Sequence, residues 1–221
     1  MLAFIHGEFM KYVYGIGVND VNYSVQLKTT IGRLNGKQQT KLIWICPFYS
    51  CWKGMLQRCY SDKYKSKWKT YVNCSVDERF HRLTTFKFWM EQQSWEGKHL
   101  DKDIIIPNNK LYSPETCAFV LPRTNTFICD RSNGRGNLPV GVTKSSNSTY
   151  RSRCNDPFSN SEQWLGTFAT KGEAHEAWRK RKHELAQLVA ETESDPRVVE
   201  ALKKRYSVEE WYKHNPNDVS F

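Results

Sequence analysis

The sequence has no long apolar run, no paired cysteine pattern and comparatively few acidic side chains. No stretch approaches the roughly 18 consecutive apolar residues of a membrane-spanning helix, so no membrane partner is expected. The N-terminus lacks the basic start, the sustained apolar run and the small-residue cleavage site of a secretory signal. Seven cysteines, an odd number without the spacing of a disulfide scaffold, favour a reducing compartment such as the cytoplasm.

Aromatic and basic residues are abundant in the 221-residue chain. It is 39% hydrophobic and 14% aromatic, which suffices for ordinary cores, excludes wholesale disorder and favours one large or two small domains. The 33 Lys and Arg residues outnumber the 23 Asp and Glu residues, for a net charge of +10. The excess is +8 in residues 1–129 and +2 in residues 130–221. A charge of this sign indicates a polyanionic partner.

Basic side chains alternate with aromatic ones at three places, Trp52-Lys53, residues 67–69 and residues 178–182. Cations beside flat rings suit phosphates together with sugars or bases. This coincidence favours nucleic-acid binding over its alternative, which is a solvated basic face on an ordinary soluble protein.

Composition divides the chain into five regions. They are an N-terminal region of unknown function (1–45), a compact unit (46–129), a polar and glycine-rich linker (130–137), a small α+β module (138–192), and a C-terminal helix with a tail (193–221). In the first two regions, strand-like pieces are expected at 12–18, 42–46, 104–106 and 118–121, and helices at 51–60 and 75–95.

The module after the linker has three short strand candidates, residues 140–143, 149–154 and 162–168. Turn residues at 145–147 and 156–160 separate them. Thr170 then suits a helix N-cap with Glu173 at the capping-box position, followed by an apolar stripe through 171–190 and a last helix over 196–206. The pattern predicts a three-stranded sheet that one helix covers on one face.

The uncovered face of that sheet is the candidate DNA-binding surface, subject to strand register. The side chains expected there are Lys144, Tyr150, Arg151, Arg153 and Trp164. A sheet can lie in the major groove of DNA with Arg reaching base edges or phosphates. The alternative is a structural domain whose Arg side chains are merely solvated.

Four sequence blocks of this module resemble the AP2 DNA-binding domain. They are LPVGV at 138–142, YRSR at 150–153, LGTFAT at 165–170 and EAHEAW at 173–178. The resemblance covers about fifty residues and implies a three-stranded sheet on one helix that binds the major groove of double-stranded DNA. Arg151, Arg153 and Trp164 match its DNA-contacting positions, whereas Ser152 departs from the small apolar residue that the family prefers.

A second group of polar residues lies in the central unit, where carboxylates and amides gather between residues 100 and 125. Such oxygen ligands suit Mg²⁺ held by few protein groups and several waters, and a metal of this kind can stabilise the leaving oxygen of a cut phosphodiester. The alternative is that these residues fix the backbone of their own turns.

Motifs from about Gly15 to Tyr206 resemble the phage-encoded HNH endonuclease-like proteins that often carry an AP2 module. The matching segments are Cys46-Pro47, Trp52-x-x-Met55-x-x-Arg58-Cys59-Tyr60, Phe86-x-x-Trp89, LDKD at 100–103 and YSPETC at 112–117. The resemblance implies an HNH-like ββα-metal unit with one Mg²⁺ or Mn²⁺ ion and a histidine base. Asp101 falls at its acidic metal-binding position and Asn125 at its final Asn or His. It also implies the cytoplasm of an infected bacterial cell.

Two positions depart from the HNH pattern. Lys102 stands where a general-base histidine often stands, and Thr116 replaces the middle Asn. His99, two residues before Asp101, could substitute as the base, while Lys102 could contact phosphate. Two functions follow, a metal-dependent endonuclease that cuts or nicks duplex DNA, and a catalytically degenerate DNA-binding protein that acts as a regulator, inhibitor or accessory factor.

Four cysteines, Cys46, Cys51, Cys59 and Cys74, precede this motif. None of their spacings is the C-x2-C of a zinc knuckle, so buried free cysteines are expected in place of a structural zinc site.

Overall fold

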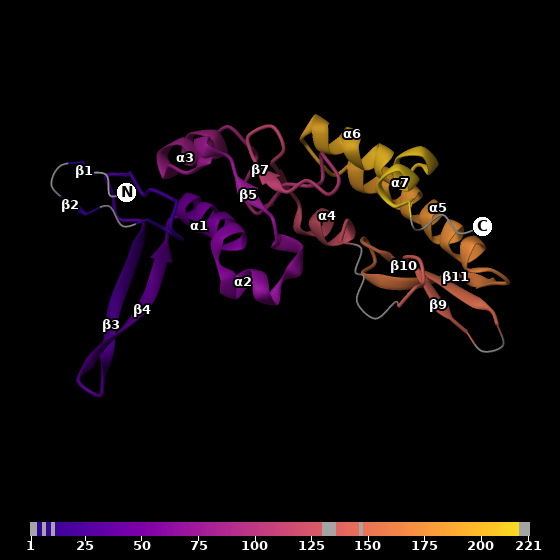
Figure 1. Cartoon of the computed structure of the whole chain (residues 1–221), viewed down its shortest axis with the longest axis horizontal. Coiled ribbons are helices and arrows are strands. Elements are labelled where there is room, and N and C mark those ends of the chain that lie inside the picture. Colours follow the sequence, from indigo (N-terminus) through magenta and orange to yellow (C-terminus); the bar gives the residue numbers. More distant parts are fainter. Residues whose placement is uncertain (1–3, 6–7, 10–11, 130–135, 146–147, 217–221) are drawn as a thin grey trace. The chain divides into compact units, whose positions relative to one another are not determined.

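A computed structural model describes residues 4–5, 8–9, 12–129, 136–145 and 148–216 (Figure 1). Most of the expected linker (130–135), part of the 145–147 turn and the tail 217–221 lie outside the described residues. The chain forms two compact units, residues 1–93 with 110–117, and residues 94–109 with 118–221. The expected unit 46–129 is therefore divided between both. Helices and five small sheets place the described residues in the expected α+β class.

The first unit begins with short strands and a long hairpin and continues into helices. In chain order its elements are β1 (Phe4–Ile5), β2 (Glu8–Phe9), β3 (Gln26–Leu34), β4 (Lys37–Ile45), α1 (Pro47–Tyr60), α2 (Asp62–Lys67), η1 (Lys69–Tyr71), β5 (Ser75–Val76), η2 (Glu78–Phe80), α3 (Leu83–Glu91) and β7 (Leu111–Tyr112). Residues 12–18 form a turn with isolated bridges in place of the expected strand.

Helix α1 organises the core of the first unit. Pro47 occupies its first turn, where a missing N–H costs nothing. The expected helical stripe is confirmed, because Trp52, Met55, Leu56 and Cys59 are its buried residues. The Trp52 indole Nε1 donates a 2.7 Å hydrogen bond to the carbonyl oxygen of Phe80, so the buried ring has no unpaired donor.

The expected helix over residues 75–95 was wrong in its first half. Ser75 and Val76 form β5, which pairs in parallel with β7, and helix α3 begins only at Leu83. Asp77 accepts from the backbone N–H of Arg79 and so starts the separate turn η2. Local side-chain bonding and a distant strand together override the apolar spacing that favoured one continuous helix.

The second unit opens with two strands and a short helix. β6 (His99–Asp101) and β8 (Ala118–Val120) pair antiparallel, with Asp101 opposite Ala118, and α4 (Pro122–Phe127) follows directly. The expected strand at 118–121 is confirmed. The expected strand at 104–106 was wrong, since these residues lie in a looped segment between β6 and Asn109.

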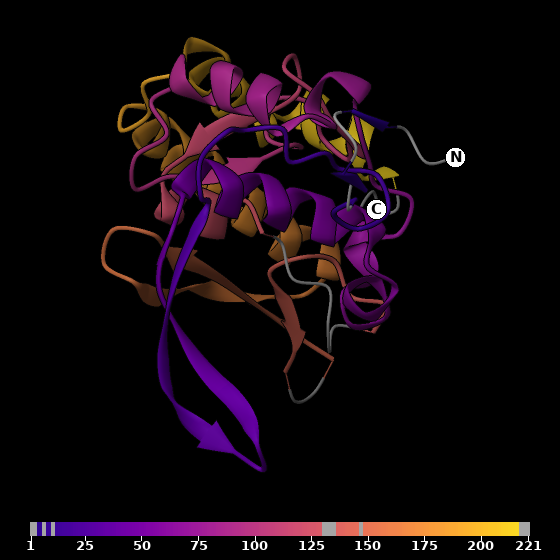
Figure 2. The same ribbon diagram turned by 90° about the vertical axis from the view of Figure 1, so that its left-hand side faces the viewer.

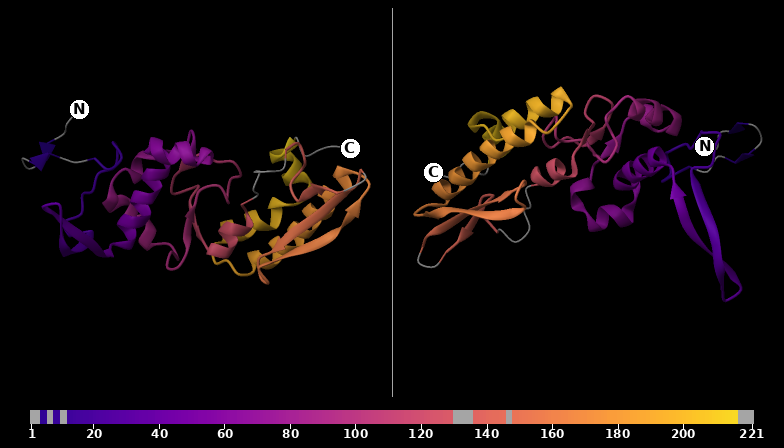
Figure 3. Two further views of the ribbon diagram at one scale, coloured as in Figure 1. Left: turned by 90° about the horizontal axis from the view of Figure 1, so that it is seen from below. Right: turned by 180° about the vertical axis from the view of Figure 1, so that it is seen from behind.

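A three-stranded antiparallel sheet and three helices complete the second unit. They are β9 (Val142–Lys144), β10 (Tyr150–Asp156), β11 (Ser161–Phe168), α5 (Lys171–Ala190), α6 (Pro196–Arg205) and α7 (Val208–His214). The strand order is β11-β10-β9, and α5 lies along one face of the sheet (Figure 3). Thr170 caps α5 with the expected capping box, since its side chain accepts from Glu173 N–H while Glu173 accepts from the N–H of Thr170.

One hydrophobic core joins the ββα element, which consists of β6, β8 and α4, to the sheet and its helices. Ile104, Val120 and Phe127 belong to the same buried cluster as Trp178 of α5 and Tyr206. Helix α7 was not expected from the sequence, yet its Trp211 is buried and donates from Nε1 to His175 Nε2 over 3.1 Å. The regions expected as separate, 138–192 and 193–221, therefore share one interior with β6, β8 and α4.

None of the helices in the described part of the chain is long and apolar enough to cross a membrane.

Candidate functional site

The exposed face of the β9-β10-β11 sheet carries three of the five side chains expected there. Along β10, exposed and buried residues alternate, which puts Arg151 and Arg153 on the face away from α5. Trp164 of β11 is opposite Arg153 and is 65% exposed. Exposed Thr143 and Thr167 flank Arg151 on the neighbouring strands. Two guanidinium groups and an indole thus share a solvent-facing surface of rigid backbone.

Strand register corrects the other two residues. Tyr150 pairs with Lys144, and by alternation both belong to the same side of the sheet as buried Ser152. The backbone at the start of β10 therefore directs them to the helix-covered side, at the sheet's end, away from the row of Arg151 and Arg153. The sequence pattern could not settle this point because a shift of one residue exchanges the two faces.

The two arginines have different surroundings. Arg153 Nη1 forms a 2.7 Å ion pair with Glu162 Oε2, and both side chains are about half exposed. Arg151 forms no ion pair with any described residue. Exposed pairs of this kind contribute little net stability, so Glu162 can release Arg153 to a phosphate at small cost. Arg151 presents its charge directly to solvent.

The ββα element brings together two of the residues expected to be catalytic, His99 as the base and Asn125 as a metal ligand. His99 at the start of β6 and Asn125 in α4 are in hydrogen-bond contact, because Asn125 Nδ2 donates to His99 Nδ1 over 3.3 Å. The acceptor role of Nδ1 places the proton of a neutral imidazole on Nε2. The Asn125 amide oxygen receives no hydrogen bond from the described residues.

Asp101 holds the segment that follows β6. Its Oδ1 accepts from the backbone N–H of Asp103 over 2.8 Å and from that of Ile104 over 2.7 Å. Burial and the neighbouring Asp103 carboxylate raise the pKa of Asp101 from its usual 3.8 to about 6. One oxygen of Asp101 therefore fixes the backbone of its own turn, which was the alternative to metal binding in the sequence analysis. The other oxygen, Oδ2, accepts neither of these two hydrogen bonds.

Lys102 lies inside the loop and is only 5% exposed. Its Nζ donates to Asp103 Oδ2 over 2.7 Å and to the carbonyl oxygen of Asn109 over 2.9 Å. This environment does not suit the expected phosphate contact, because the ammonium is already desolvated and bonded within the fold. Lys102 instead closes the loop from residue 102 to residue 109.

The donor chemistry of the element suits a hard divalent cation. His99 and Asp101 lie on one side of β6 by strand alternation, and Asn125 contacts His99. Asp101 Oδ2 and Asn125 Oδ1 are oxygen atoms of the kind that Mg²⁺ binds when it also retains waters. Within the described residues, no group of three or more His, Cys, Asp or Glu side chains is arranged to hold a metal.

Three of the five side chains in the basic and aromatic run at 178–182, whose composition favoured a nucleic-acid contact, lie inside the fold. Trp178, Arg179 and Lys182 are buried in the second unit. Lys182 Nζ donates to the carbonyl oxygen of Phe127 at the end of α4, and it lies 3.9 Å from the Phe127 ring centroid and 5.1 Å from that of Tyr206. Lys182 is thus a positioning residue for α4 that sequence reasoning missed.

A signal for this role exists in the sequence. Lys182 follows Trp178 by four residues and precedes Leu185 by three, so it lies on the buried stripe of α5. Long basic side chains can lie along apolar surface while their charged end finds a polar partner. A lysine on an apolar helical stripe therefore predicts a buried side chain that hydrogen-bonds within the fold, and not a contact with DNA.

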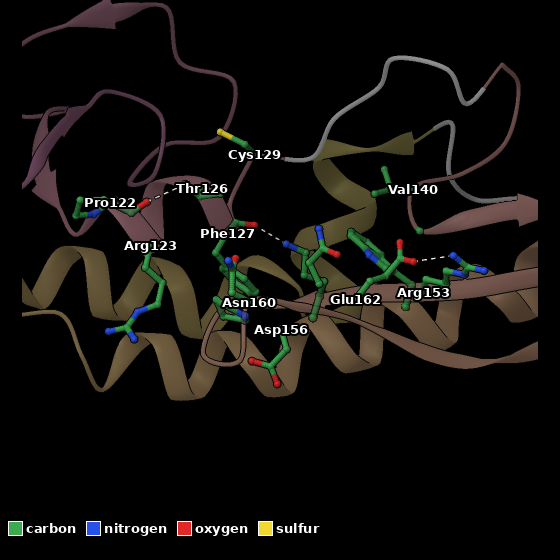
Figure 4. Close-up of a pocket in the computed structure, with 15 residues that line it drawn as sticks. Pro122, Arg123, Thr126, Phe127, Cys129, Val140, Arg153, Asp156, Asn160 and Glu162 are labelled. Carbon is green, nitrogen blue, oxygen red and sulfur yellow. Dashed lines mark hydrogen bonds and ion pairs between the residues drawn. The ribbon is translucent and has the colours of Figure 1, made fainter.

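A cavity of about 700 Å³ lies between α4, the sheet and α5 (Figure 4). Arg123 and Arg153 line it together with Asp156 and Glu162, and the buried Lys182 is at its wall. Figure 4 shows the Arg153–Glu162 ion pair beside this space. The cavity has charges of both signs, of which Arg153 and Glu162 form an ion pair, and its lining does not include His99, Asp101 or Asn125.

The four cysteines considered for zinc lie in the first unit. Cys46, Cys59 and Cys74 are buried, as the sequence favoured, and Cys51 is partly buried.

Comparisons with models of protein families, with curated proteins and with solved structures found no match to this chain. The likeness to AP2 and HNH proteins therefore rests on sequence motifs, and function must be inferred from the placement of the side chains.

Proposed function

We propose that this chain binds double-stranded DNA through the exposed face of the β9-β10-β11 sheet and hydrolyses a phosphodiester bond at the ββα element. The observation that supports binding most directly is the exposed row of Arg151, Arg153 and Trp164 on adjacent strands. Arginine pairs with phosphate oxygens and with guanine edges, and an exposed indole can rest on sugar or base surfaces. This sheet is the AP2-like part of the proposal.

The HNH-like part of the proposal assigns the chemistry to β6, β8 and α4. Asp101 Oδ2 and Asn125 Oδ1 would hold Mg²⁺ or Mn²⁺, which stabilises negative charge on the phosphate and its leaving oxygen. In hydrolysis a water oxygen bonds to phosphorus, the P–O ester bond breaks and the leaving oxygen takes a proton. His99 serves as the proton-transferring group, and its Nε2–H can donate to a phosphate or leaving oxygen.

For His99 to accept a proton from water, a ring nitrogen must lose its present role. The Asn125 amide occupies Nδ1, and Nε2 carries the proton of the neutral ring. Release of Nδ1 from Asn125 as the amide oxygen turns to the cation would leave a basic nitrogen on His99. Asn125 thus has two roles in the proposal, since it supplies a ligand and sets the histidine tautomer.

A second candidate is DNA binding without cleavage. The favouring observation is that Asp101 Oδ1 and His99 Nδ1 are both engaged within the fold, while Lys102 stands at the usual base position and is buried. A chain of this kind would act as a regulator, an inhibitor or an accessory factor on DNA.

One experiment separates the candidates. Wild-type protein, Asn125→Ala and Arg151→Ala are incubated with supercoiled plasmid and with phage genomic DNA in Mg²⁺ or Mn²⁺, and binding is measured on the same DNA. The endonuclease predicts metal-dependent nicking or cutting that Asn125→Ala abolishes while binding is retained. Binding by wild type without any cleavage supports the second candidate. Absence of binding at low salt contradicts both.

A further inference from the structure

The β3–β4 hairpin of the first unit is exposed along almost its whole length. Every residue from 27 to 44 is exposed, and in Figure 2 the hairpin extends beyond the other elements of its unit. Its tip is a two-residue turn in which Asn35 (φ 49°) and Gly36 (φ 74°) adopt the left-handed conformation of a type I′ hairpin. A two-stranded ribbon exposed on both faces is marginally stable in water, which indicates that a partner covers it.

The hairpin carries charge of one sign only. It contains Lys28, Arg33, Lys37 and Lys41, and no acidic residue occurs between Asp20 and Asp62. None of these four cations forms an ion pair with a described residue. They are held close together on one ribbon without compensation, so their mutual repulsion is relieved only by an anionic partner or by salt.

The strand register distributes these cations over both faces. Lys37 and Lys41 share one face, where Lys41 pairs with Thr29. Lys28 and Arg33 share the opposite face, where they pair with Leu42 and Gln38. Each face therefore presents two positive charges, with polar and apolar side chains between them.

We propose that the β3–β4 hairpin is a second DNA-contacting element, which enters the major groove of duplex DNA as a two-stranded ribbon. This inference rests on the proposed function, since it takes DNA as the partner. The major groove admits a two-stranded ribbon, and phosphates line both of its walls. Cations on both faces match that arrangement, while threonine and glutamine side chains suit base edges and the apolar ones suit thymine methyls.

The alternative occupant is a second copy of this chain. Six large apolar side chains of the hairpin are exposed, at 44% to 66%: Leu27, Ile31, Leu34, Leu42, Ile43 and Trp44. Self-association through either face would, however, bring two positive charges of one copy against two of the other, with no acidic residue of the hairpin to offset them. The charge pattern therefore favours DNA.

The test compares two variants of the full chain with equal charge change. The hairpin variant is K28Q/R33Q/K37Q/K41Q, and the control is K180Q/K203Q/K204Q/K213Q, which removes four exposed lysines from α5, α6 and α7. The affinity for a fluorescent mixed-sequence duplex is measured over a range of KCl concentrations. Circular dichroism and thermal unfolding establish that both variants fold as the wild type does.

We expect the hairpin variant to bind at least about tenfold more weakly at moderate salt. The slope of log K against log salt should also flatten, by about 0.9 for each phosphate that the hairpin no longer neutralises. The control should retain the wild-type slope. The half variants K28Q/R33Q and K37Q/K41Q should each flatten the slope, because each removes the cations that face one groove wall.

Equal slopes for the hairpin variant and the control would overturn the inference while leaving the proposed function intact. A hairpin variant that changes only the sedimentation behaviour of the protein, with an unaltered slope, would assign the ribbon to a second copy and equally overturn it. Failure of the wild type to bind the duplex at low salt is a separate result, which contradicts the proposed function itself.

Discussion

Arg153 of β10 and Trp164 of β11 lie directly opposite each other on the uncovered face of the sheet, and Glu162 pairs with Arg153 from the same strand as Trp164. A bulge between Ser152 and Arg153 shifts the register at this point. Bulges re-aim side chains, and here the shift sets a guanidinium opposite an exposed ring. The Glu162 carboxylate holds the Arg153 guanidinium on this face of the sheet.

The first prediction concerns this surface. Arg151→Ala should weaken DNA binding by about 1–3 kcal/mol, since the guanidinium has no ion pair to break before it meets DNA. Glu162→Ala should leave affinity unchanged or raise it, because Arg153 loses its internal competitor. Gel-shift titrations measure both effects. Lys180→Ala, which removes an equal charge from α5, serves as the control, and an equal loss in that variant would contradict a specific role for the sheet.

The second prediction concerns the pH dependence of cleavage. The pKa of Asp101 is raised to about 6, so its carboxylate is largely protonated below that pH and largely ionised above it. A divalent cation needs the ionised form. Cleavage with Mg²⁺ should therefore rise with pH through about 6, as pH–rate profiles would show. Asp101→Asn should abolish the rise, and persistence of the same profile in this variant would assign it to another group.

Stability should change in the opposite sense over the same pH range. The folded-state pKa of Asp101 exceeds its usual value of 3.8, so the folded protein binds this proton more tightly than the unfolded chain does. Its contribution to stability is present below pH 3.8 and is lost as the pH rises to about 6. Urea unfolding at several pH values should show a smaller loss across this window for Asp101→Asn, whose amide oxygen can still accept from Asp103 and Ile104.

The third prediction concerns the hydrogen bond from Lys182 of α5 to the carbonyl oxygen of Phe127 in α4. Lys182→Met keeps the length of the buried side chain but removes the donor to the Phe127 carbonyl and the charge among the rings. We expect a loss of about 1–3 kcal/mol in the free energy of unfolding. The exposed Lys180→Met should change stability by less than about 0.5 kcal/mol. Urea titrations compare them, and equal stability of the two variants would show that this hydrogen bond contributes nothing.

The fourth prediction concerns Gly141, at the entry to β9. Its φ is +79°, and an added Cβ would lie 2.1 Å from the Trp178 ring, so Gly141→Ala combines backbone strain with a clash in the core. We expect a loss of about 3 kcal/mol or more. Gly97→Ala is the matched control, because its φ is +69° but nothing lies within 4 Å. It should cost only about 1–2 kcal/mol, and thermal unfolding would distinguish the two.

Local signals in the sequence predicted much of the second unit. The capping box at Thr170 and Glu173 marks the start of α5, and the turn residues separate β10 from β11 as expected. These features depend on neighbouring residues, so they can be recognised without the fold. His99 and Asn125 were each named as candidate catalytic residues, but their contact with each other is a finding of the structure that the sequence did not predict.

Features that depend on distant residues could not be predicted in this way. Tyr150 and Lys144 lie on the helix side because of the strand register, and Lys102 is buried because Asn109 comes back to its Nζ. The apolar residues 104–106 suggested a strand, yet Asp101 Oδ1 binds two backbone N–H groups and bends the chain there. In each case a side chain or strand beyond the local window decides the outcome.

Each of the two units is built from two separate stretches of the chain, so the order of synthesis determines when each unit can fold. The chain leaves the first unit after Gln93, returns to it for residues 110–117 and then finishes the second unit. Strand β5 must therefore wait for β7, more than thirty residues later, before their ladder can form. Likewise β6 has no partner until β8 is made. Neither unit can complete its fold on the ribosome while only the early part of the chain has emerged. A premature stop before residue 111 would therefore leave both units without strands that they need.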